Sequence, residues 1–406
     1  MSKIIKDISI RNLGPIKQAD IELGDLTVLV GQQATGKSIF LQTLKLLMDR
    51  DHIHKIFNNN NTVFKGRAEV FLDAYYGKNM SPLWQSATSI NANLGPRFYT
   101  YDEESNEATP KPDDIVSINL KDYATPTGKP FNDQESVFYI PAQRVMSTPQ
   151  GITQHFGTYK FGDPYVLRVF SDNLHQLLQT TFATESDLSP EKLLPEMLGK
   201  QVKEQVYAGA DLVFKEDSDY VRKLMLNIPD GPQGLPFLTW SAGQREFTPL
   251  LLGLYNFFNL HPHDRMFWKY VVIEEPEMGL HPQAINVTLY MILSLIARGH
   301  KVLLSTHSPQ VLDMVWALRT CQQKGGVPQD VLDIFRLGHE SGDLTAELAL
   351  KQQYKVYYFQ RSGIVEDISA LDPGSDNPAQ AHWGGLTEFA GRAGDVVSQV
   401  VNRAGF

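Results

Sequence analysis

Residues 31–38 read Gly31-Gln32-Gln33-Ala34-Thr35-Gly36-Lys37-Ser38 and match the pattern G-x-x-x-x-G-K-[ST]. The stretch follows the apolar run Leu26–Val30 and precedes a helical pattern over Ser38–Asp51, which is the context this pattern requires. Glycines let the loop curl so that backbone N–H groups face phosphates, and the helix N-terminus adds positive charge. Lys37 would reach the β- and γ-phosphates, and Ser38 would ligate Mg²⁺. The sequence therefore predicts an ATP-binding P-loop formed by these eight residues, rather than a chance glycine loop.

Further apolar runs outward from this loop predict a sheet. The runs are Ile8–Ile10, Tyr270–Ile273 and Val302–Ser305, and Pro282–Arg298 follows the second of them with a helical pattern. Continuous β-branched runs suit strands that are covered on both faces. Because strands alternate with helices, we expect an α/β protein with a parallel core sheet and crossover helices.

Other regions carry different patterns. Residues 60–140 contain turn signals and short apolar runs such as Ala68–Tyr75 and Ser136–Ile140, which favour antiparallel strands and loops. Residues 165–225 read as helical, and Leu371–Pro378 is a turn-rich linker.

Two acidic residues stand directly after the strand Tyr270–Ile273. An acid at the end of a buried strand can hold Mg²⁺, and a second acid beside it can orient or deprotonate the attacking water. We assign the metal to Glu274 and the water to Glu275, although an acidic solvated turn is the more ordinary interpretation of such a cluster.

His307 also follows a strand, and its imidazole could sense a γ-phosphate. On its own, His307 would be interpreted as a structural histidine.

The segment Ser241-Ala242-Gly243-Gln244 precedes a helical pattern over Phe247–Asn259. Small residues at a free helix N-terminus form an anion site. The alternative is an ordinary capping box between Ser241 and Gln244, and both interpretations can hold together.

Composition limits the classes of partner. The net charge of −9 counts against constitutive coating of nucleic acid, so nucleic acid is possible as a partner but is not indicated. Cys321 is the single cysteine, which fits a reducing compartment, and the longest apolar runs fall short of a membrane span. We therefore expect a cytoplasmic protein with no membrane partner.

The order of these motifs resembles the ABC ATPase superfamily, and most of all the branch that holds SMC proteins, RecF and OLD-family ATPases, also described as AAA-like ATPases. The stretches Ile10–Ile16, Gly279–Pro282 and Ser305–Ser308 strengthen the resemblance. It implies a signature motif at Ser241–Gln244, a Walker B acid at Glu274, a catalytic Glu275, a D-loop at Gly279–Pro282 and a switch His307.

The sequence departs from the family pattern at three places. Glu274 stands where the family usually has aspartate, and Ala242 replaces the first glycine of the signature. The Q-loop is not marked by a distinctive motif. We assign it to Gln143, as a ligand of nucleotide and Mg²⁺, with contact between Arg144 and phosphate as the alternative.

The resemblance also sets the expected organisation. We expect an ABC-type P-loop ATPase with a mixed or parallel core sheet, an antiparallel β subdomain and a helical lobe. Its discontinuous core would span 1–160 and 226–345, with the lobe at 161–225 and a C-terminal segment at 346–406. The stretch between Gln143 and Ser241 lacks sustained heptads, and the chain offers no room for the TOPRIM domain of OLD nucleases. It therefore resembles stand-alone ATPase subunits of bacterial anti-phage systems, whose effector is a separate nuclease or toxin.

Three functions follow as hypotheses. The first is a switch or sensor that forms an ATP-sandwiched homodimer, or a higher homo-oligomer, and controls a separate effector. The second is a RecF- or SMC-like DNA repair or recombination ATPase, which a basic stripe would favour. The third is the ATP-hydrolysing subunit of a transporter, which the form of Glu274–Glu277 and Ser305–Pro309 disfavours.

The C-terminal segment repeats apolar residues at helical spacing. Core packing is the ordinary interpretation of such a helix face, and docking of the effector is the alternative. The residues are Phe389, Val396, Val397, Val400 and Val401.

Overall fold

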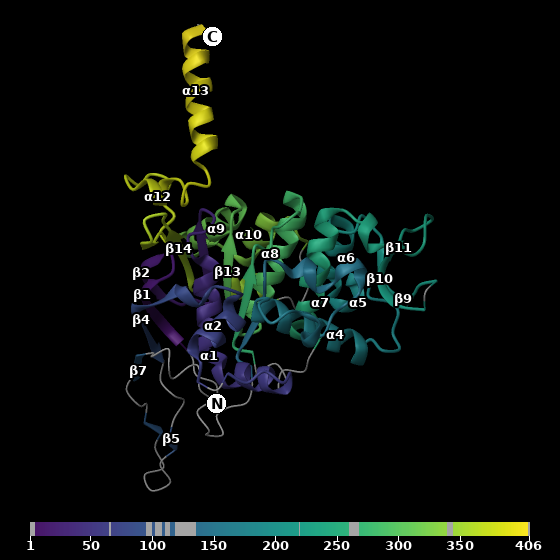
Figure 1. Cartoon of the computed structure of the whole chain (residues 1–406). Coiled ribbons are helices and arrows are strands. Elements are labelled where there is room, and N and C mark those ends of the chain that lie inside the picture. The colour runs from purple at the N-terminus through teal and green to yellow at the C-terminus, as the bar shows by residue number, and fades with distance from the viewer. Residues whose placement is uncertain are drawn as a thin grey trace.

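The computed structural model describes residues 5–64, 66–94, 100–101, 108–109, 114–117, 135–218, 220–259, 268–338 and 344–404. The strands of the central sheet are β3 Leu26–Gly31, β8 Val137–Ile140, β12 Tyr270–Glu274, β13 Lys301–Thr306, β14 Tyr354–Phe359 and β15 Val365–Asp367. Their order is β15-β14-β3-β13-β12-β8. Neighbours from β8 to β14 run parallel, and β15 pairs antiparallel with β14 (Figure 1). The predicted parallel core sheet of an α/β protein is confirmed.

Both faces of this sheet are buried, which explains the continuous apolar runs of its strands. Val271 and Ile273 in β12 enter one core, whereas Tyr270 and Val272 enter the other. The first core is built with helices that include α7 Ala242–Asn259, α8 Pro282–Ala297 and α9 Pro309–Lys324, and the second with α1 Lys37–Asn59, which is kinked at Asp49. The expected helices after β3 and β12 are therefore confirmed.

A second sheet is antiparallel and packs over α1. Its strands are β1 Ile5–Leu13, β2 Ile16–Glu22, β4 Trp84–Leu94 and β7 Asp114–Ser117, in the order β2-β1-β4-β7, and β5 Thr100–Tyr101 pairs separately with β6 Ala108–Thr109. Ile8 and Ile10 of β1 enter the same core as Phe40 of α1. The predicted antiparallel β part of the fold is confirmed.

Two expectations for residues 60–140 are wrong. The run predicted as a strand over Ala68–Tyr75 forms helix α2 Ala68–Tyr76, followed by the 3₁₀ turn η1 Ser81–Leu83. The run at Ser136–Ile140 is a strand, but it pairs parallel with β12 and belongs to the core sheet. The helix is favoured over a strand because Phe71, Leu72 and Tyr75 fall on one helical face. Phe71 and Tyr75 enter an aromatic cluster, and Leu72 is buried in the same core.

The stretch expected to be helical over 165–225 is helical only in its first part. It contains α4 Tyr165–Thr180, α5 Pro190–Leu193 and α6 Glu196–Gln205. Antiparallel strands then follow, β9 Asp211–Glu216, β10 Arg222–Asn227 and β11 Leu235–Pro236. The expectation is wrong over these strands, whose buried side chains pack into the core that holds α7.

The remaining short elements are η2 Arg144–Ser147, η3 Pro149–Gly151, η4 Phe156–Thr158, η5 Phe237–Thr239, α10 Pro328–Phe335, α11 Thr345–Ala349 and α12 Pro378–Ala381.

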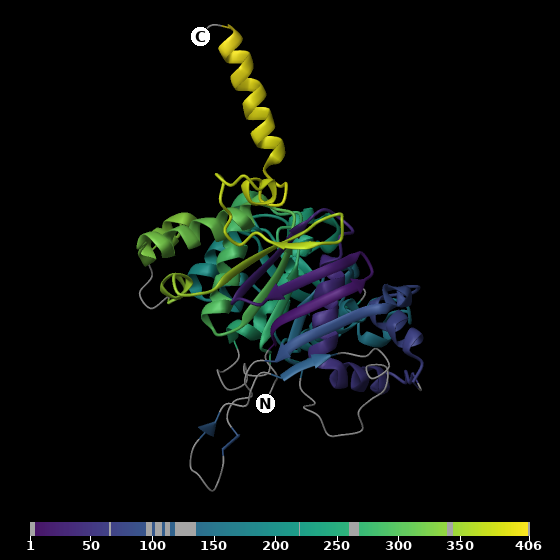
Figure 2. The same cartoon turned by 90° about the vertical axis from the view of Figure 1, so that its left-hand side faces the viewer.

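The last helix, α13 Glu388–Ala404, extends away from the body of the molecule in both views (Figures 1 and 2). Its predicted apolar stripe is exposed, with Phe389 at 74% and Val397 at 61%. Core packing, the ordinary interpretation of this stripe, is therefore wrong, because no other part of the described chain covers the helix. None of the described helices combines the length and the apolarity needed to cross a membrane.

Candidate functional site

The residues singled out in the sequence follow the carboxyl ends of neighbouring parallel strands. In the order β3-β13-β12-β8, these ends lead into the P-loop, His307, Glu274–Glu275 and Gln143 respectively. Crevices at the carboxyl edge of a parallel sheet are where α/β proteins bind ligands. The sheet order therefore brings segments that are far apart in sequence to one edge.

The P-loop owes its shape to glycines at its two ends. Gly31 has φ 147° and Gly36 has φ 103°, both in the region that favours glycine. A Cβ on Gly31 would stand 2.4 Å from the Phe359 carbonyl oxygen, and a Cβ on Gly36 would stand 2.6 Å from Ile16 Cγ1. Larger residues at either position would collide with β14 or β2.

Within the loop, Gln32, Gln33, Ala34 and Ser38 are exposed, whereas Thr35 and Lys37 are largely buried. Together with Gly31 and Gly36 these are the residues predicted to bind nucleotide.

Lys37 points back along the loop that precedes it. Its Nζ donates to the carbonyl oxygens of Gly31 at 2.6 Å and Gln32 at 2.8 Å, and the Thr35 hydroxyl also donates to Gln32 O at 2.8 Å. Burial lowers the pKa of Lys37 to about 8, against the opposing charges of Glu275, Glu274 and Glu277. The ammonium group of Lys37 therefore lies within the P-loop and close to three carboxylates.

Glu274 ends β12 as a buried carboxyl group. Its Oε2 accepts a hydrogen bond from the Ala142 amide at 3.0 Å, which joins β12 to the segment that carries Gln143. Its Oε1 is buried and makes no hydrogen bond of standard geometry with the described residues, although the hydroxyl groups of Ser38 and Tyr139 lie close to the carboxyl group. Burial raises the pKa of Glu274, and the neighbouring Ser38 hydroxyl and Ala142 amide act in the opposite direction.

Glu274 Oε1 and the neighbouring Ser38 hydroxyl are the atoms to consider as ligands for Mg²⁺. Within the described residues, no three His, Cys, Asp or Glu side chains converge to form a metal cage. Mg²⁺ bound with a nucleotide does not need one, because it takes one or two protein oxygens and completes its shell with phosphates and water. Glu274 Oε1 and the exposed Ser38 hydroxyl fit that arrangement.

Glu275 and His307 face each other across the ends of β12 and β13. Glu275 Oε1 lies 3.5 Å from His307 Nε2, and the Glu275 amide donates to Ser305 O at 2.8 Å. Glu275 has φ 45°, which is uncommon for a residue with a side chain. Burial and the charge of Lys37 lower the pKa of His307, and Glu275 and Glu277 oppose that shift.

The sequence alone did not reveal the role of Glu277. Its Oε1 accepts hydrogen bonds from the Thr306 hydroxyl and from the His307 amide, both at 2.7 Å. It therefore holds the turn that carries His307. The acidic run was visible in the sequence, but its partners lie about thirty residues away and meet it only because β12 and β13 are neighbours.

The signature segment forms the capping box that the sequence allowed. Ser241 N donates to Gln244 Oε1 at 3.0 Å, and Gln244 N donates to Ser241 Oγ at 3.2 Å. Ser241 and Ala242 are exposed, whereas Gly243 is buried against the D-loop, where an added Cβ would stand 2.7 Å from Gly279 O. In the described part of the chain, no hydrogen bond or ion pair links this segment to the P-loop.

Gln143 and Arg144 lie in different environments in the structure. Gln143 is exposed beside Ala142, at the edge where Glu274 lies. Arg144 is fully buried and directs its guanidinium at main-chain carbonyl oxygens. The alternative that Arg144 contacts phosphate therefore does not fit.

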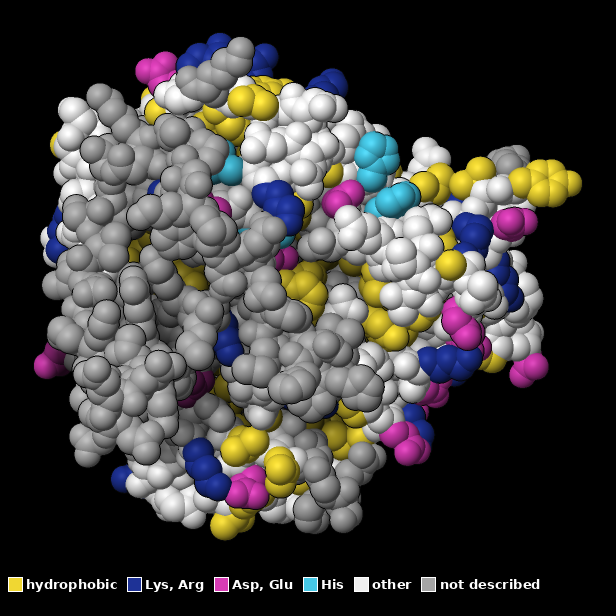
Figure 3. All heavy atoms as spheres, turned by 90° about the horizontal axis from the view of Figure 1, so that it is seen from below, with side chains coloured by type: hydrophobic (Ala, Val, Ile, Leu, Met, Phe, Trp, Pro, Cys, Tyr) yellow, Lys and Arg dark blue, Asp and Glu magenta, His cyan; other side chains and the backbone are white. Residues whose placement is uncertain are grey.

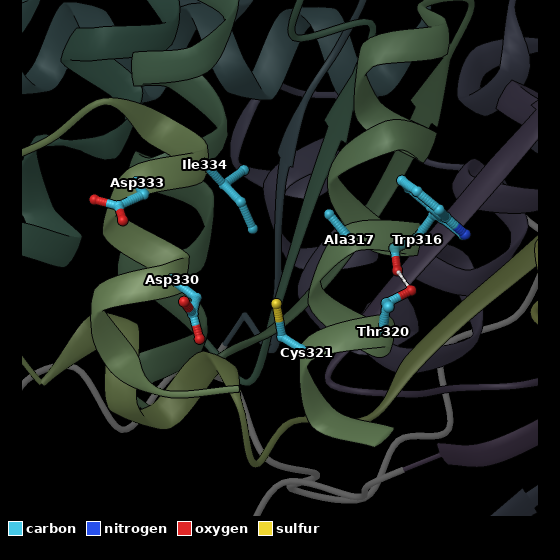
Figure 4. A pocket seen from close by; sticks show the side chains of 7 residues that line it. All are labelled: Trp316, Ala317, Thr320, Cys321, Asp330, Asp333 and Ile334. Carbon is cyan, nitrogen blue, oxygen red and sulfur yellow. Dashed lines mark hydrogen bonds between the residues drawn. The ribbon is translucent and has the colours of Figure 1, made fainter. Parts of the chain in front are cut away.

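A separate hollow of 360 Å³ lies between α9 and α10. It is lined by Trp316, Ala317, Thr320, Cys321, Asp330, Asp333 and Ile334 (Figure 4). None of these residues belongs to the strand-end site, and the hollow offers no cation for a phosphate.

The surface seen from below bears on the nucleic-acid hypothesis. On the part of this face that described residues form, Lys and Arg side chains are interspersed with Asp and Glu (Figure 3). A basic stripe, which would have favoured a DNA-binding ATPase, is not visible there among the described residues.

No curated protein matches the sequence. Among solved structures, the chain is similar to the SMC head domain from Thermotoga maritima, with 9% identity, a TM-score of 0.36, and coverage of 90% of this chain and 98% of that one. It is also similar to an SmcHead bound to the C-winged helix domain of ScpA, with 9% identity, a TM-score of 0.39, and coverage of 89% and 96%.

One protein-family model matches the N-terminal part of the chain. Residues 4–125 match the AAA ATPase domain family, and this range contains the whole P-loop at Gly31–Ser38. This part of the chain is therefore similar to the AAA ATPase domain.

Proposed function

We propose that this protein hydrolyses ATP at the carboxyl edge of its core sheet and uses the cycle of binding and hydrolysis as a switch. The observation that carries the proposal is the approach of Glu275 to His307, 3.5 Å apart, beside the P-loop lysine. This places a carboxylate that can accept the proton of water next to an imidazole that can donate a hydrogen bond to a γ-phosphate.

The chain's own residues divide the work as follows. The P-loop amides and Lys37 hold the β- and γ-phosphates. Ser38, Glu274 and Gln143 would supply oxygen ligands for Mg²⁺, whose charge would neutralise the phosphates. Glu275 orients a water molecule and accepts its proton as the water oxygen bonds to the γ-phosphorus. The bond between that phosphorus and the ADP oxygen breaks, which leaves ADP and phosphate. His307 donates a hydrogen bond to the γ-phosphate.

The signature segment is proposed to act on a second copy. Ser241 and Ala242 are exposed at the N-terminus of α7 and make no hydrogen bond to their own P-loop among the described residues. A helix N-terminus with small residues suits the capping of a γ-phosphate. Two copies related by a two-fold axis would then enclose two ATP molecules.

We expect ATP to double the mass of a hydrolysis-deficient protein. The Glu275→Gln variant should be monomeric without nucleotide and dimeric with ATP and Mg²⁺, because ATP then persists between the two copies. Light scattering after size exclusion measures the mass in both states.

Ser241→Arg is the matched control, since its side chain would occupy the space of the partner's γ-phosphate. Combined with Glu275→Gln, it should leave ATP binding intact and keep the protein monomeric. A mass that is unchanged by ATP in Glu275→Gln alone would contradict the sandwich.

The effector is proposed to be a separate protein, a nuclease or toxin, in an anti-phage role in the cytoplasm. The exposed stripe on α13 supports the docking of a partner protein, whereas the nuclease or toxin identity and the anti-phage role follow from the sequence resemblance. Phe389, Val396 and Val400 fall in one row along the helix together with Arg392 and Arg403. An effector with an apolar groove and an acidic rim would match this row.

Purified protein should hydrolyse ATP without cutting nucleic acid. With Mg²⁺ or Mn²⁺, supercoiled DNA, linear DNA and RNA should remain intact, because the carboxylates of the strand-end site are used for nucleotide. Gel electrophoresis of these substrates checks the expectation. A nuclease activity that copurifies with the chain and survives Lys37→Ala would reveal a second active site and overturn the proposal.

A further inference from the structure

Arg144 connects two parts of the candidate site from a fully buried position. Its Nε donates to Glu246 O at 3.0 Å, Nη1 to Glu274 O at 2.8 Å and Nη2 to Glu275 O at 2.9 Å. The nearest carboxylate oxygen for which an ion pair is seen is Glu246 Oε2, at 3.9 Å from Nε. A guanidinium whose nitrogens all bind main-chain oxygens ties segments together.

One of these segments is the backbone of Glu275. Its φ of 45° lies in the left-handed region, which a residue with a side chain keeps only where its surroundings fix it. The Glu275 amide is held by Ser305 O at 2.8 Å, and its carbonyl oxygen is held by Arg144. The Met278 amide also donates to the Glu275 carbonyl oxygen, at 3.1 Å. Arg144 therefore supplies one of three hydrogen bonds to the Glu275 backbone, and it is the one that links this backbone to α7.

The other segment is the first part of α7. Glu246 lies a little over one helical turn after Ser241, and the start of the helix is packed against Gly279 through Gly243. A shift of the signature segment would therefore move the Glu246 carbonyl oxygen. Because a guanidinium is planar and presents its donors in a rigid fork, such a shift is passed to the carbonyl oxygens of Glu274 and Glu275.

We infer that Arg144 is a positioning residue that couples the signature segment to Glu275, so that a displacement of the start of α7 misaligns the water-orienting carboxylate. The inference rests on the proposed function, in which Glu275 orients water and Ser241–Gln244 engages the nucleotide of a second copy. Arg144 itself touches neither nucleotide nor water.

Arg144→Lys tests this role, because lysine keeps the charge and loses the fork. We expect the Kd for ATP to stay within about twofold and kcat to fall by about 10- to 100-fold, the range expected when a catalytic group is misplaced by about 1 Å. Titration calorimetry and steady-state ATP hydrolysis separate the two effects. The double variant Arg144→Lys, Glu275→Gln should be no slower than Glu275→Gln alone, because both changes act through one carboxylate.

Arg168→Lys is the control for the loss of a buried arginine. Arg168 is also buried, and its guanidinium lies 3.8 Å from the centre of the Phe156 ring. This variant should lower the melting temperature and leave kcat within about twofold of wild type, because the loss of a buried cation–π contact affects stability. The inference is overturned if kcat of Arg144→Lys equals that of wild type, if it falls no further than in Arg168→Lys, or if the Kd for ATP weakens in parallel with kcat.

If Arg144→Lys does not fold, a measurement on protein that retains Arg144 tests the coupling instead. Amide hydrogen exchange in the peptides that contain Arg144 and Glu275 should slow when ATP is added to Glu275→Gln. Adding Ser241→Arg should abolish this slowing, and its persistence would overturn the coupling. If wild-type protein hydrolyses no ATP at all, the proposed function fails instead, which is a different outcome from normal hydrolysis in Arg144→Lys.

Discussion

Replacing Glu275 by Gln is expected to lower kcat for ATP hydrolysis by about 10²- to 10⁴-fold, the range that a general base contributes. Glutamine keeps the size of the side chain and a polar contact to His307 Nε2, which lies 3.5 Å from the carboxylate in the structure. It cannot accept the proton of the attacking water. The Kd for ATP should stay within about threefold, since the phosphates are held by the P-loop and Lys37. Phosphate release and equilibrium ATP binding measure the two quantities.

The matched control for this variant is Glu347→Gln. Glu347 is an exposed acid on α11 that pairs with Lys351, and its replacement should leave kcat within about twofold of wild type. A Glu275→Gln protein that turns over ATP at the wild-type rate would remove Glu275 from the mechanism.

The sequence predicted those parts of the fold whose signal is local. The strands β3, β12 and β13 were identified because their residues are buried on both faces, and α1 and α8 because they follow strands with helical periodicity. The prediction of a strand at Ala68–Tyr75 was wrong because the signal there is not local. A short apolar run has no clear period, and the aromatic cluster around Phe71 that selects helix is assembled by tertiary packing.

Long-range contacts could not be inferred in the same way. The motifs located Glu274, Glu275 and His307, but the contacts of Glu277 with Thr306 and His307 arise only from the pairing of β12 with β13. The periodicity of α13 predicted the helix and its apolar face correctly. It could not tell whether that face is buried, because a helix has the same pattern whether its partner is its own core or another molecule.

Replacing Lys37 by Ala is expected to weaken ATP binding by about two to three orders of magnitude. Removing one partner of a buried charge pair with phosphate costs 2–5 kcal/mol in comparable contacts, and about 1.4 kcal/mol corresponds to each tenfold change. Lys37 is buried and is the cation of the P-loop, so no other residue of the loop replaces its charge. Lys351→Ala, at an exposed lysine on the α11–β14 connection, should leave the Kd unchanged.

The pH dependence of binding identifies the same lysine. A lysine whose pKa is lowered to about 8 loses its proton as the pH rises through 8, and the neutral amine no longer attracts phosphate. The Kd of wild-type protein for ATP should therefore be constant below pH 7.5 and weaken by about tenfold between pH 8 and pH 9, with one proton taken up on binding. The residual binding of Lys37→Ala should lack this dependence. Affinity in wild type that stays constant to pH 9 would mean that the ammonium keeps its proton, and that burial of Lys37 is compensated by its three neighbouring carboxylates.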